Sequence, residues 1–364
     1  MRLSTKAAKT PIQEASSAAE TLELLRLKLS KIVPDFELEY KAELAFKINQ
    51  LKKKRNAVVL AHNYMEPALY HSIADYQGDS LELSRIAARS NADIIVFCGV
   101  RFMAETAKIL NPSKKVLLPA IKAGCSLAAS ISGEDVRRFK ARFPGVPVVS
   151  YVNTYAEVKA ESDYCCTSSN AAAVINYLAD EGHERVIFLP DEYLAKNIAK
   201  EIGIPIIFPS KPAAARPDDP ENLQRVIIGW HGRCEVHEKF TVGDIENVRR
   251  QFPDTIVLAH PECSSEVVAA ADFSGSTKAM IDYVKNSSAP RYLLLTECSM
   301  GDNIIAENPD KDVLRLCSVR CPHMNLITLE DTLAALENDR FIINLPEEIM
   351  TRARTSLERM LEIG

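Results

Sequence analysis

The sequence predicts an α/β protein made of three similar three-layer αβα domains around a pseudo-threefold axis, with the functional residues at its centre. The main observation is a pattern of strands and helices that occurs three times in the 364 residues. Each copy has a charged helical stretch, an apolar strand, a polar turn, two more strands separated by a helix, and then a cysteine. A repeat of about 100 residues has the size of a domain, so three small domains are expected rather than a solenoid.

The repeats divide the chain into four segments. We expect a partly helical N-terminal extension at residues 1–39 and three αβα repeats at residues 40–131, 132–240 and 241–364, the last with a C-terminal strand and helix. Residues 22–29 and 40–51 have apolar side chains at three- and four-residue intervals, which is typical of amphipathic helices. These two helices are therefore expected to precede the first sheet.

Nine short, mainly apolar runs are expected to contain the strands. They are residues 57–64, 94–97 and 116–118 in the first repeat, 147–154, 186–189 and 206–208 in the second, and 255–262, 292–295 and 313–316 in the third. A closing strand at residues 341–345 and a helix at 347–363 finish the chain. Because the strands alternate with helices, they predict parallel sheets built from right-handed βαβ units. The Pro- and Asp-rich residues 211–221 are expected to form a surface loop.

Small hydroxyl residues lie in the turn after the first strand of each repeat. A hydroxyl at a helix start caps free backbone N–H groups, so each turn predicts a helix N-terminus. Such N-termini also bind phosphate or carboxylate, and three of them around one centre predict a substrate with several anionic groups. The hydroxyl residues are Ser80, Thr167, Ser168, Ser276 and Thr277.

Polar side chains follow the first strands, where parallel sheets place their functional residues. They are His62, Asn63, Tyr64, Tyr151, Asn153, His260 and Glu262. His62 and His260 end equivalent strands and are expected to face one cleft. Glu262 is the candidate base, with a pKa raised by its surroundings. The alternative for Glu262 is an acid in the first turn of a helix.

Three further histidines suggest no role. His71, His183 and His231 are expected at the surface or at helix ends.

Cys125, Cys234 and Cys321 occupy the same place in the three repeats, in loops with Gly, Pro or His neighbours. The chain has no CxxC pair, which disfavours structural zinc. Three thiolates without a fourth protein ligand suit a [4Fe–4S] cluster with one open iron, which can act as a Lewis acid. Each cysteine taken singly could instead fill space in a core.

The other cysteines fit the space-filling alternative better. Cys98, Cys165, Cys263 and Cys298 are expected in cores. Cys317 forms a CxxxC with Cys321, but no third cysteine follows to complete a radical-SAM triad. It is therefore expected to be a core or edge thiol.

Composition excludes several classes of protein. A net charge of −5 with acids and bases interspersed gives no general field for nucleic acid. The longest apolar runs are the size of strands and are too short to span a bilayer. The basic run at residues 52–55 is expected to be the solvated end of a helix. A cytoplasmic location is expected, and in that compartment the nine cysteines would not form a disulfide framework.

Taken together, the motifs resemble those of the quinolinate synthase family over residues 40–360. The motifs are residues 61–64, 78–81, 99–105, 151–153, 166–168, 230–237, 260–263, 275–277, 296–297 and 321–324. The resemblance implies a transferase with a [4Fe–4S] cluster held by Cys125, Cys234 and Cys321, whose open iron acts as a Lewis acid. The family condenses iminoaspartate with dihydroxyacetone phosphate to quinolinate for NAD biosynthesis, releasing phosphate and two waters.

The resemblance also assigns roles to individual residues. It implies an acid–base group of Tyr64, Glu262, His62 and His260. It implies substrate contacts from His62, Ser80, Tyr151, Asn153, Ser168, His237, His260, Glu262, Ser276 and Thr277. An L-aspartate oxidase or dehydrogenase is the implied source of the unstable imine and a transient partner. Departures from some members are Ser126 after Cys125 and the CxxxC spacing of Cys317 and Cys321.

Two other functions remain open from the residues themselves. Another cluster-dependent dehydratase would share the three cysteines but would not release phosphate. A cluster-based redox sensor would need a DNA- or partner-binding element, and the sequence has no helix-turn-helix pattern or basic recognition helix.

Overall fold

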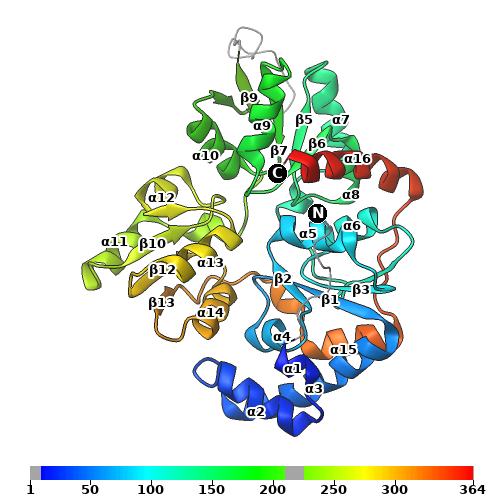
Figure 1. Ribbon diagram of the computed structural model, residues 1–364. Helices are drawn as coiled ribbons and strands as arrows, with labels where there is room; N and C mark the ends of the chain where they lie inside the picture. Colours follow the sequence, from blue (N-terminus) through cyan, green and yellow to red (C-terminus); the bar gives the residue numbers. More distant parts are fainter. Residues whose placement is uncertain (1–9, 210–224, 364) are drawn as a thin grey trace.

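The computed structural model describes residues 10–209 and 225–363, which form three lobes (Figure 1). Each lobe contains one parallel β-sheet with helices packed on it, so the predicted α/β fold with three similar αβα domains is confirmed. The exact domain boundaries stay a prediction. The expected loop at residues 211–221 lies outside the described residues.

The first and third sheets have the same strand order. The first runs β2-β1-β3-β4 and the third β11-β10-β12-β13, with every neighbouring pair parallel. Their strands are β1 (Ala57–His62), β2 (Tyr76–Gly78), β3 (Ile94–Cys98), β4 (Lys115–Leu117), β10 (Ile256–Ala259), β11 (Phe273–Ser274), β12 (Arg291–Leu295) and β13 (Asp312–Arg315). The short edge strands β2 and β11 were not predicted.

The second sheet repeats this order and adds one strand. It runs β6-β5-β7-β9-β8, with β5 (Val148–Tyr151), β6 (Tyr164–Cys166), β7 (Arg185–Leu189), β8 (Ile206–Ile207) and β9 (Val226–Gly229). The run at residues 206–208, which contains β8, was expected to be the third strand of this repeat. That assignment is wrong, because β9 pairs with β7 as β4 pairs with β3, whereas β8 lies outside β9 at the edge.

Helices cover both faces of the sheets. On the first sheet, α3 (Asp35–Arg55) packs with α15 (Leu329–Asn338), and α5 (Ser80–Arg89) packs with α6 (Arg101–Leu110). On the second, α8 (Ala156–Glu161) packs with α7 (Gly133–Arg142) and α16 (Glu347–Ile363), and α9 (Ala171–Asp180) with α10 (Glu192–Ile202). The third lobe has α11 (Val242–Gln251), α12 (Ser265–Ala270), α13 (Thr277–Asn286) and α14 (Cys298–Glu307). The short helices α1 (Pro11–Glu14) and α4 (Pro67–Ser72) and the longer α2 (Ala18–Leu29) pack beside α3.

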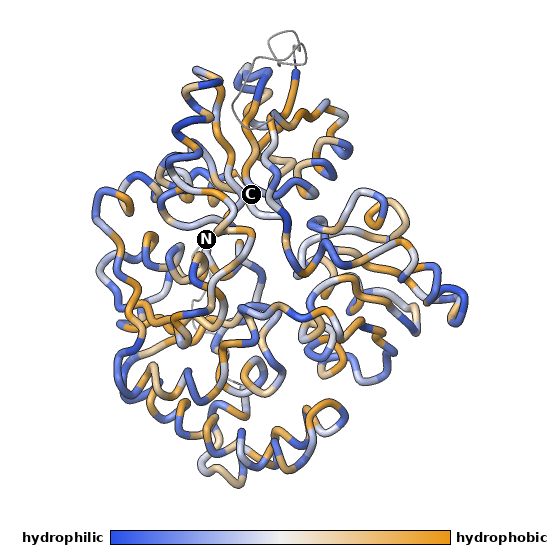
Figure 2. Tube along the Cα trace, turned by 180° about the vertical axis from the view of Figure 1, so that it is seen from behind, coloured by the Kyte–Doolittle hydropathy of each residue, from blue (hydrophilic) through white to orange (hydrophobic). Residues whose placement is uncertain are grey.

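Burial on both faces explains why the strands are apolar throughout. In β12, Leu293 and Leu295 join one buried cluster, whereas Tyr292 and Leu294 join another on the opposite face. Side chains alternate across a strand, so a sheet covered on both sides needs apolar residues at every position. Figure 2 shows hydrophobic colour on many segments inside the lobes and hydrophilic colour on many segments at the outside.

One aspartate in each repeat fastens the start of the first strand. The carboxylates of Asp75, Asp163 and Asp272 accept the backbone N–H of Val59, Val148 and Val257 at 2.7, 2.8 and 2.7 Å. The backbone N–H of each aspartate also donates to the carbonyl of the same valine, at 2.9 Å in all three repeats. The same contact in three places supports the repeat seen in the sequence.

Two expectations about the ends of elements are corrected. Residues 341–345 form no strand, because Ile342 makes only an isolated antiparallel bridge to Leu117. Pro346, which has no backbone N–H to donate, follows soon after. The basic run at residues 52–55 does end helix α3, but Lys52 is buried and pairs with Asp75 at 2.9 Å. None of the described helices is long and apolar enough to span a membrane.

Removing the repeated aspartates is expected to destabilise the fold unequally. Asp272→Ala removes the acceptor for one strand N–H and a half-exposed ion pair with Arg249, a loss of about 1–3 kcal/mol to which the ion pair adds little. Asp75→Ala removes the same acceptor and also the carboxylate facing the buried Lys52, which raises the expected cost to about 3–5 kcal/mol. Chemical unfolding of the two variants measures the difference. Equal losses of unfolding free energy would contradict this account of Asp75.

Candidate active site

A small cavity of about 70 Å³ lies where the carboxyl ends of the three sheets meet. It brings together thirteen of the fourteen predicted site residues: His62, Tyr64, Ser80, Cys125, Tyr151, Asn153, Ser168, Cys234, His237, His260, Glu262, Thr277 and Cys321. Ser276 lines an adjoining cavity, to which Ser168 also contributes. The predicted convergence of strand ends is therefore present in the structure.

The three cysteines share one local backbone arrangement. Each lies three residues before a short 3-10 helix, at η1 (Ala128–Ser130), η3 (His237–Lys239) or η4 (Met324–Leu326). The carbonyls of Cys125, Cys234 and Cys321 accept the N–H four residues on at 3.0, 3.0 and 3.1 Å. This turn projects each thiol into the cavity from a different lobe.

Burial at the cavity changes the pKa of these thiols. Burial raises the pKa of Cys125 to about 12, that of Cys321 to about 11, and that of Cys234 well above its usual value. Backbone N–H groups two and three residues after each cysteine oppose the shift by hydrogen bonding to the sulfur. Those N–H groups are donors suited to a thiolate, the form that binds a metal.

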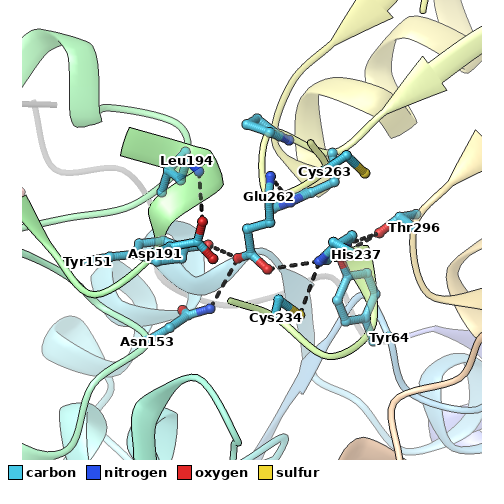
Figure 3. Close-up of polar contacts among 12 residues, drawn as sticks. Tyr64, Tyr151, Asn153, Asp191, Leu194, Cys234, His237, Glu262, Cys263 and Thr296 are labelled. Atoms are coloured by element: carbon cyan, nitrogen blue, oxygen red, sulfur yellow. Dashed lines mark hydrogen bonds and ion pairs between the residues drawn. The ribbon is translucent and has the colours of Figure 1, made fainter. Parts of the chain in front are cut away.

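A chain of polar contacts crosses the cavity (Figure 3). The Tyr64 hydroxyl lies 2.6 Å from Thr296 Oγ1, which lies 3.0 Å from His237 Nε2. His237 Nδ1 lies 2.8 Å from Glu262 Oε2, and the Tyr151 hydroxyl donates to Glu262 Oε1 at 2.5 Å. Hydrogen bonds therefore connect two tyrosines from different lobes through one histidine and one carboxylate. Such a chain can move a proton.

The two strand-end histidines are equivalent in structure as well as in sequence. His62 Nδ1 accepts the N–H of Tyr64 at 3.2 Å, and His260 Nδ1 accepts the N–H of Glu262 at 3.3 Å. Burial lowers the pKa of His62 to about 4 and that of His260 to about 3. Both rings are therefore neutral at neutral pH. Because Nδ1 accepts, each ring carries its proton on Nε2 as a hydrogen-bond donor.

Glu262 is buried, but its pKa is lowered rather than raised. Burial alone would raise the pKa, but the charge and hydrogen bond of His237 outweigh it, with help from Tyr151. The expected raised value is thus wrong for this structure, because His237 could not be placed from the sequence pattern. The alternative of a helical acid also fails, since α12 begins only at Ser265. Glu262 is a carboxylate able to accept a proton.

The hydroxyl turns only partly cap helices. Ser276 caps α13, as predicted. Asp79 caps α5 in place of Ser80, accepting from two backbone N–H groups, and α9 begins only after Asn170. Oδ1 of Asp79 accepts both the Leu81 and the Glu82 N–H, and Oδ1 of Asn170 accepts the N–H of Thr167. Ser80 and Ser168 consequently face the cavity with hydroxyls not used as caps.

Two further cysteines pair with each other. Cys298 and Cys317, expected as thiols, form a disulfide with a Cα–Cα distance of 5.2 Å. The return of the chain through α14 and β13 brings them together, which spacing alone could not show. The disulfide leaves Cys321 as the third-repeat cysteine at the cavity. Cys98, Cys165 and Cys263 are buried away from it, as predicted.

The remaining histidines are found in mixed positions. His183 and His231 are exposed, as expected. His71 lies in the last turn of α4, which fits the expected helix-end position, but it is buried because α4 is enclosed by α2, α3 and α14. Its Nδ1 lies 3.4 Å from Glu307, away from the cavity.

Two residues at the site were not assigned from the sequence. Thr296 follows β12 directly, and Asp191 follows β7 after one proline. Both residues lie at the carboxyl end of a parallel strand, where functional residues are expected. Neither follows the first strand of its repeat, from which the predicted residues were taken. Thr296 links Tyr64 to His237, and Asp191 lies beside Tyr151 and Glu262 in Figure 3.

The donor atoms at this cavity fit a metal group. Cys234, His237 and Glu262 offer ligand atoms within 4.8 Å of one another, and Cys125 and Cys321 line the same cavity. Three soft thiol ligands favour iron–sulfur over a hard cation such as magnesium.

Comparison with known proteins gives one consistent answer. Residues 46–362 match the model of the family described as quinolinate synthetase A protein. The chain is 50% identical over 336 residues to quinolinate synthase 2 of Mesorhizobium japonicum, covering 92% of this chain and 96% of that protein. It is 46% identical over 337 residues to the quinolinate synthase of Caulobacter vibrioides, covering 92% and 86%.

A third relative matches a larger share of the chain. It is the quinolinate synthase of Agrobacterium fabrum, 48% identical over 352 residues, or 97% of this chain and 94% of that protein. The chain therefore belongs to the quinolinate synthetase A family.

Proposed function

We propose that this protein is a quinolinate synthase of NAD biosynthesis that condenses iminoaspartate with dihydroxyacetone phosphate. The products are quinolinate, one phosphate and two waters, which balances the atoms of the two substrates. The observation that carries the proposal is the position of one cysteine from each lobe in the same buried cavity as the Tyr64-to-Tyr151 chain of polar contacts. A metal group and acid–base residues are thereby within reach of one substrate.

Cys125, Cys234 and Cys321 are the proposed ligands of a [4Fe–4S] cluster. Three thiols from three lobes suit a cubane with one iron free of protein ligands. When bound, this cluster supplies a Lewis acid for a substrate hydroxyl or carboxylate. The disulfide of Cys317 and the burial of Cys98 and Cys165 away from the cavity support this choice of three.

The proposed acid–base work falls to the chain of contacts around Glu262. Glu262 is a buried carboxylate and accepts a proton from substrate carbon or nitrogen, while His237, Thr296 and Tyr64 pass protons across the cavity. The Nε2–H groups of His62 and His260 are neutral donors for substrate carboxylates or carbonyls. Proton transfer and binding are thereby assigned to different groups.

The hydroxyl residues at the cavity are the proposed anion contacts. Ser80 begins α5 and Thr277 begins α13, so backbone N–H groups lie beside both hydroxyls. Ser168 lies where the central cavity meets the neighbouring one, and Ser276 lines the latter. Tyr151 and Asn153 also belong to the proposed group of anion contacts. Both donate to the Glu262 carboxylate, at 2.5 and 3.3 Å, so their donor groups face the cavity beside it.

The reaction itself is the first test. Anaerobically purified protein supplied with dihydroxyacetone phosphate and with imine generated by an L-aspartate oxidase or dehydrogenase is expected to form quinolinate and phosphate in equal amounts. Chromatography of quinolinate and a phosphate assay measure the two. Phosphate-free dehydration products would favour another cluster-dependent dehydratase, and the absence of any product from protein with a full cluster would refute the proposal.

Loss of any cavity cysteine is expected to abolish the cluster. Cys125→Ala, Cys234→Ala and Cys321→Ala should each lose most of the roughly four irons and four sulfides of a cubane. Cys98→Ala and Cys165→Ala are matched controls, because both thiols are buried away from the cavity. Iron and sulfide analysis decides, and full iron content in a cavity variant would remove that residue from the ligand set.

Glu262→Gln and Ser168→Ala are expected to differ in kind. The glutamine keeps the shape but cannot accept a proton, so kcat should fall by about 10² to 10⁴-fold with the cluster retained. Loss of one Ser168 hydroxyl contact should mainly raise KM, by about tenfold or less. Steady-state kinetics under anaerobic conditions separates the two. Near-normal kcat in Glu262→Gln would move the base to another residue.

A further inference from the structure

Asp191 is a second buried carboxyl at the proposed active site. It follows β7 at the carboxyl end of the second sheet and is fully buried. Its Oδ1 accepts the N–H of Leu194 at 2.7 Å and so caps α10. Figure 3 shows the carboxyl group beside Tyr151 and Glu262, on the side of Glu262 opposite His237.

Capping α10 uses only one oxygen of this carboxyl. Among the described residues, Asp191 Oδ2 has no hydrogen-bond partner although it is fully enclosed. A buried polar atom without a partner is costly, so this oxygen calls for an explanation beyond packing. An asparagine or serine would cap the helix as well. Capping alone therefore does not explain this aspartate.

Two enclosed carboxyl groups side by side cannot both be charged at low cost. Burial and then the charge of Glu262 raise the pKa of Asp191 well above its usual value. His237 and Tyr151 instead stabilise the Glu262 carboxylate. The basic side chains of Lys196, His231 and Arg233 pair with Glu192, the next residue along the chain, and not with Asp191. The proton of the carboxyl pair therefore resides on Asp191.

The backbone of Asp191 also supports the loop that carries Cys234. Asp191 forms a parallel bridge with Gly232, and the N–H of Glu192 donates to the Gly232 carbonyl at 2.8 Å. A Cβ at Gly232 would lie 2.5 Å from the Pro190 carbonyl, so this approach requires glycine. The position of Asp191 relative to the Cys234 and His237 loop is thus tightly set.

We propose that Asp191 is a positioning residue that presents its Oδ2–H to the Glu262–Tyr151 pair and holds the Glu262 carboxylate in the orientation that accepts a substrate proton. Asp191 keeps its own proton throughout, so no further acid or base is needed. The inference rests on the proposed function, because it assigns Asp191 a part in that reaction. The site then contains a neutral carboxylic acid, Asp191, beside the ionised carboxylate of Glu262.

Two cap-preserving variants test the role. Asp191→Asn keeps an acceptor for Leu194 N–H and places an N–H donor at the position of Oδ2. Asp191→Ser keeps only the helix cap. Asp191→Asn is expected to retain kcat within about threefold, whereas Asp191→Ser should lower kcat by about tenfold or more with KM little changed. Iron content and thermal unfolding confirm that both variants are folded and loaded.

The kinetic outcomes are decisive in both directions. A kcat for Asp191→Ser equal to that of the parent would show that Asp191 only caps α10. A kcat for Asp191→Asn as low as that for Asp191→Ser would show that the reaction requires a carboxyl group that can ionise or exchange its proton, not a fixed donor. Either result overturns the proposal. Ser17→Ala, which removes the cap of the distant helix α2, is the control for loss of a cap and should leave kcat unchanged.

Infrared spectroscopy tests the protonated carboxyl without any turnover. The parent protein at neutral pH should show the C=O band of a protonated carboxylic acid that is absent in Asp191→Asn and shifted in Glu262→Gln. Absence of this band in the parent overturns the inference about Asp191, even if quinolinate is formed. Failure to form quinolinate with the band present would instead reject the proposed function and leave the protonated Asp191 in place.

Discussion

The buried carboxylate of Glu262 is the contact on which the centre of this molecule depends. Glu262 is 3% exposed, and a charge at such a position is stable only where donors replace water. Those donors come from other parts of the chain: Tyr151 ends β5 in the second sheet and Asn153 follows it, and His237 lies just after Cys234. Because Tyr151 and Asn153 of the second lobe donate to Glu262 of the third, these hydrogen bonds hold the two lobes together at the cavity. The charge of Glu262 also leaves its neighbour Asp191 to carry a proton.

A second constraint is the repeated turn that presents each cysteine. The three 3-10 turns place a sulfur against backbone N–H groups in each lobe, and a capped helix follows every turn, at Ser132, Thr241 and Thr328. Because each turn lies in a different lobe, the distances among the sulfurs depend on how the lobes pack. Contacts such as Glu262 with Tyr151 and Tyr64 with Thr296 hold that packing. The polar contacts around Glu262 and the spacing of the three thiols are therefore coupled in this fold.

Local patterns predicted most of the fold, because burial on both faces makes the strands apolar and periodic. β3, β7 and β12 were found within one or two residues for this reason. β9 was missed because the equivalent apolar run at β8 precedes it, and only pairing with β7 distinguishes the two. The pKa of Glu262, the cap at Asp79 and the pairing of Cys298 with Cys317 depend on side chains distant in sequence. No periodicity or spacing contains that information. The convergence of strand ends, in contrast, follows from parallel topology, and it would also have located Asp191 and Thr296 had it been applied to every strand.

In the proposed site, a cluster with one open iron shares the cavity with the chain of contacts around Glu262. The Mössbauer spectrum of anaerobically purified protein, recorded with and without saturating quinolinate, tests this arrangement. One iron of the cluster is expected to change its parameters when quinolinate is added, because a carboxylate or the ring nitrogen would reach the iron that has no protein ligand. A spectrum in which all irons stay unchanged at saturating quinolinate would rule the arrangement out, since the cluster would then be closed to the substrate site.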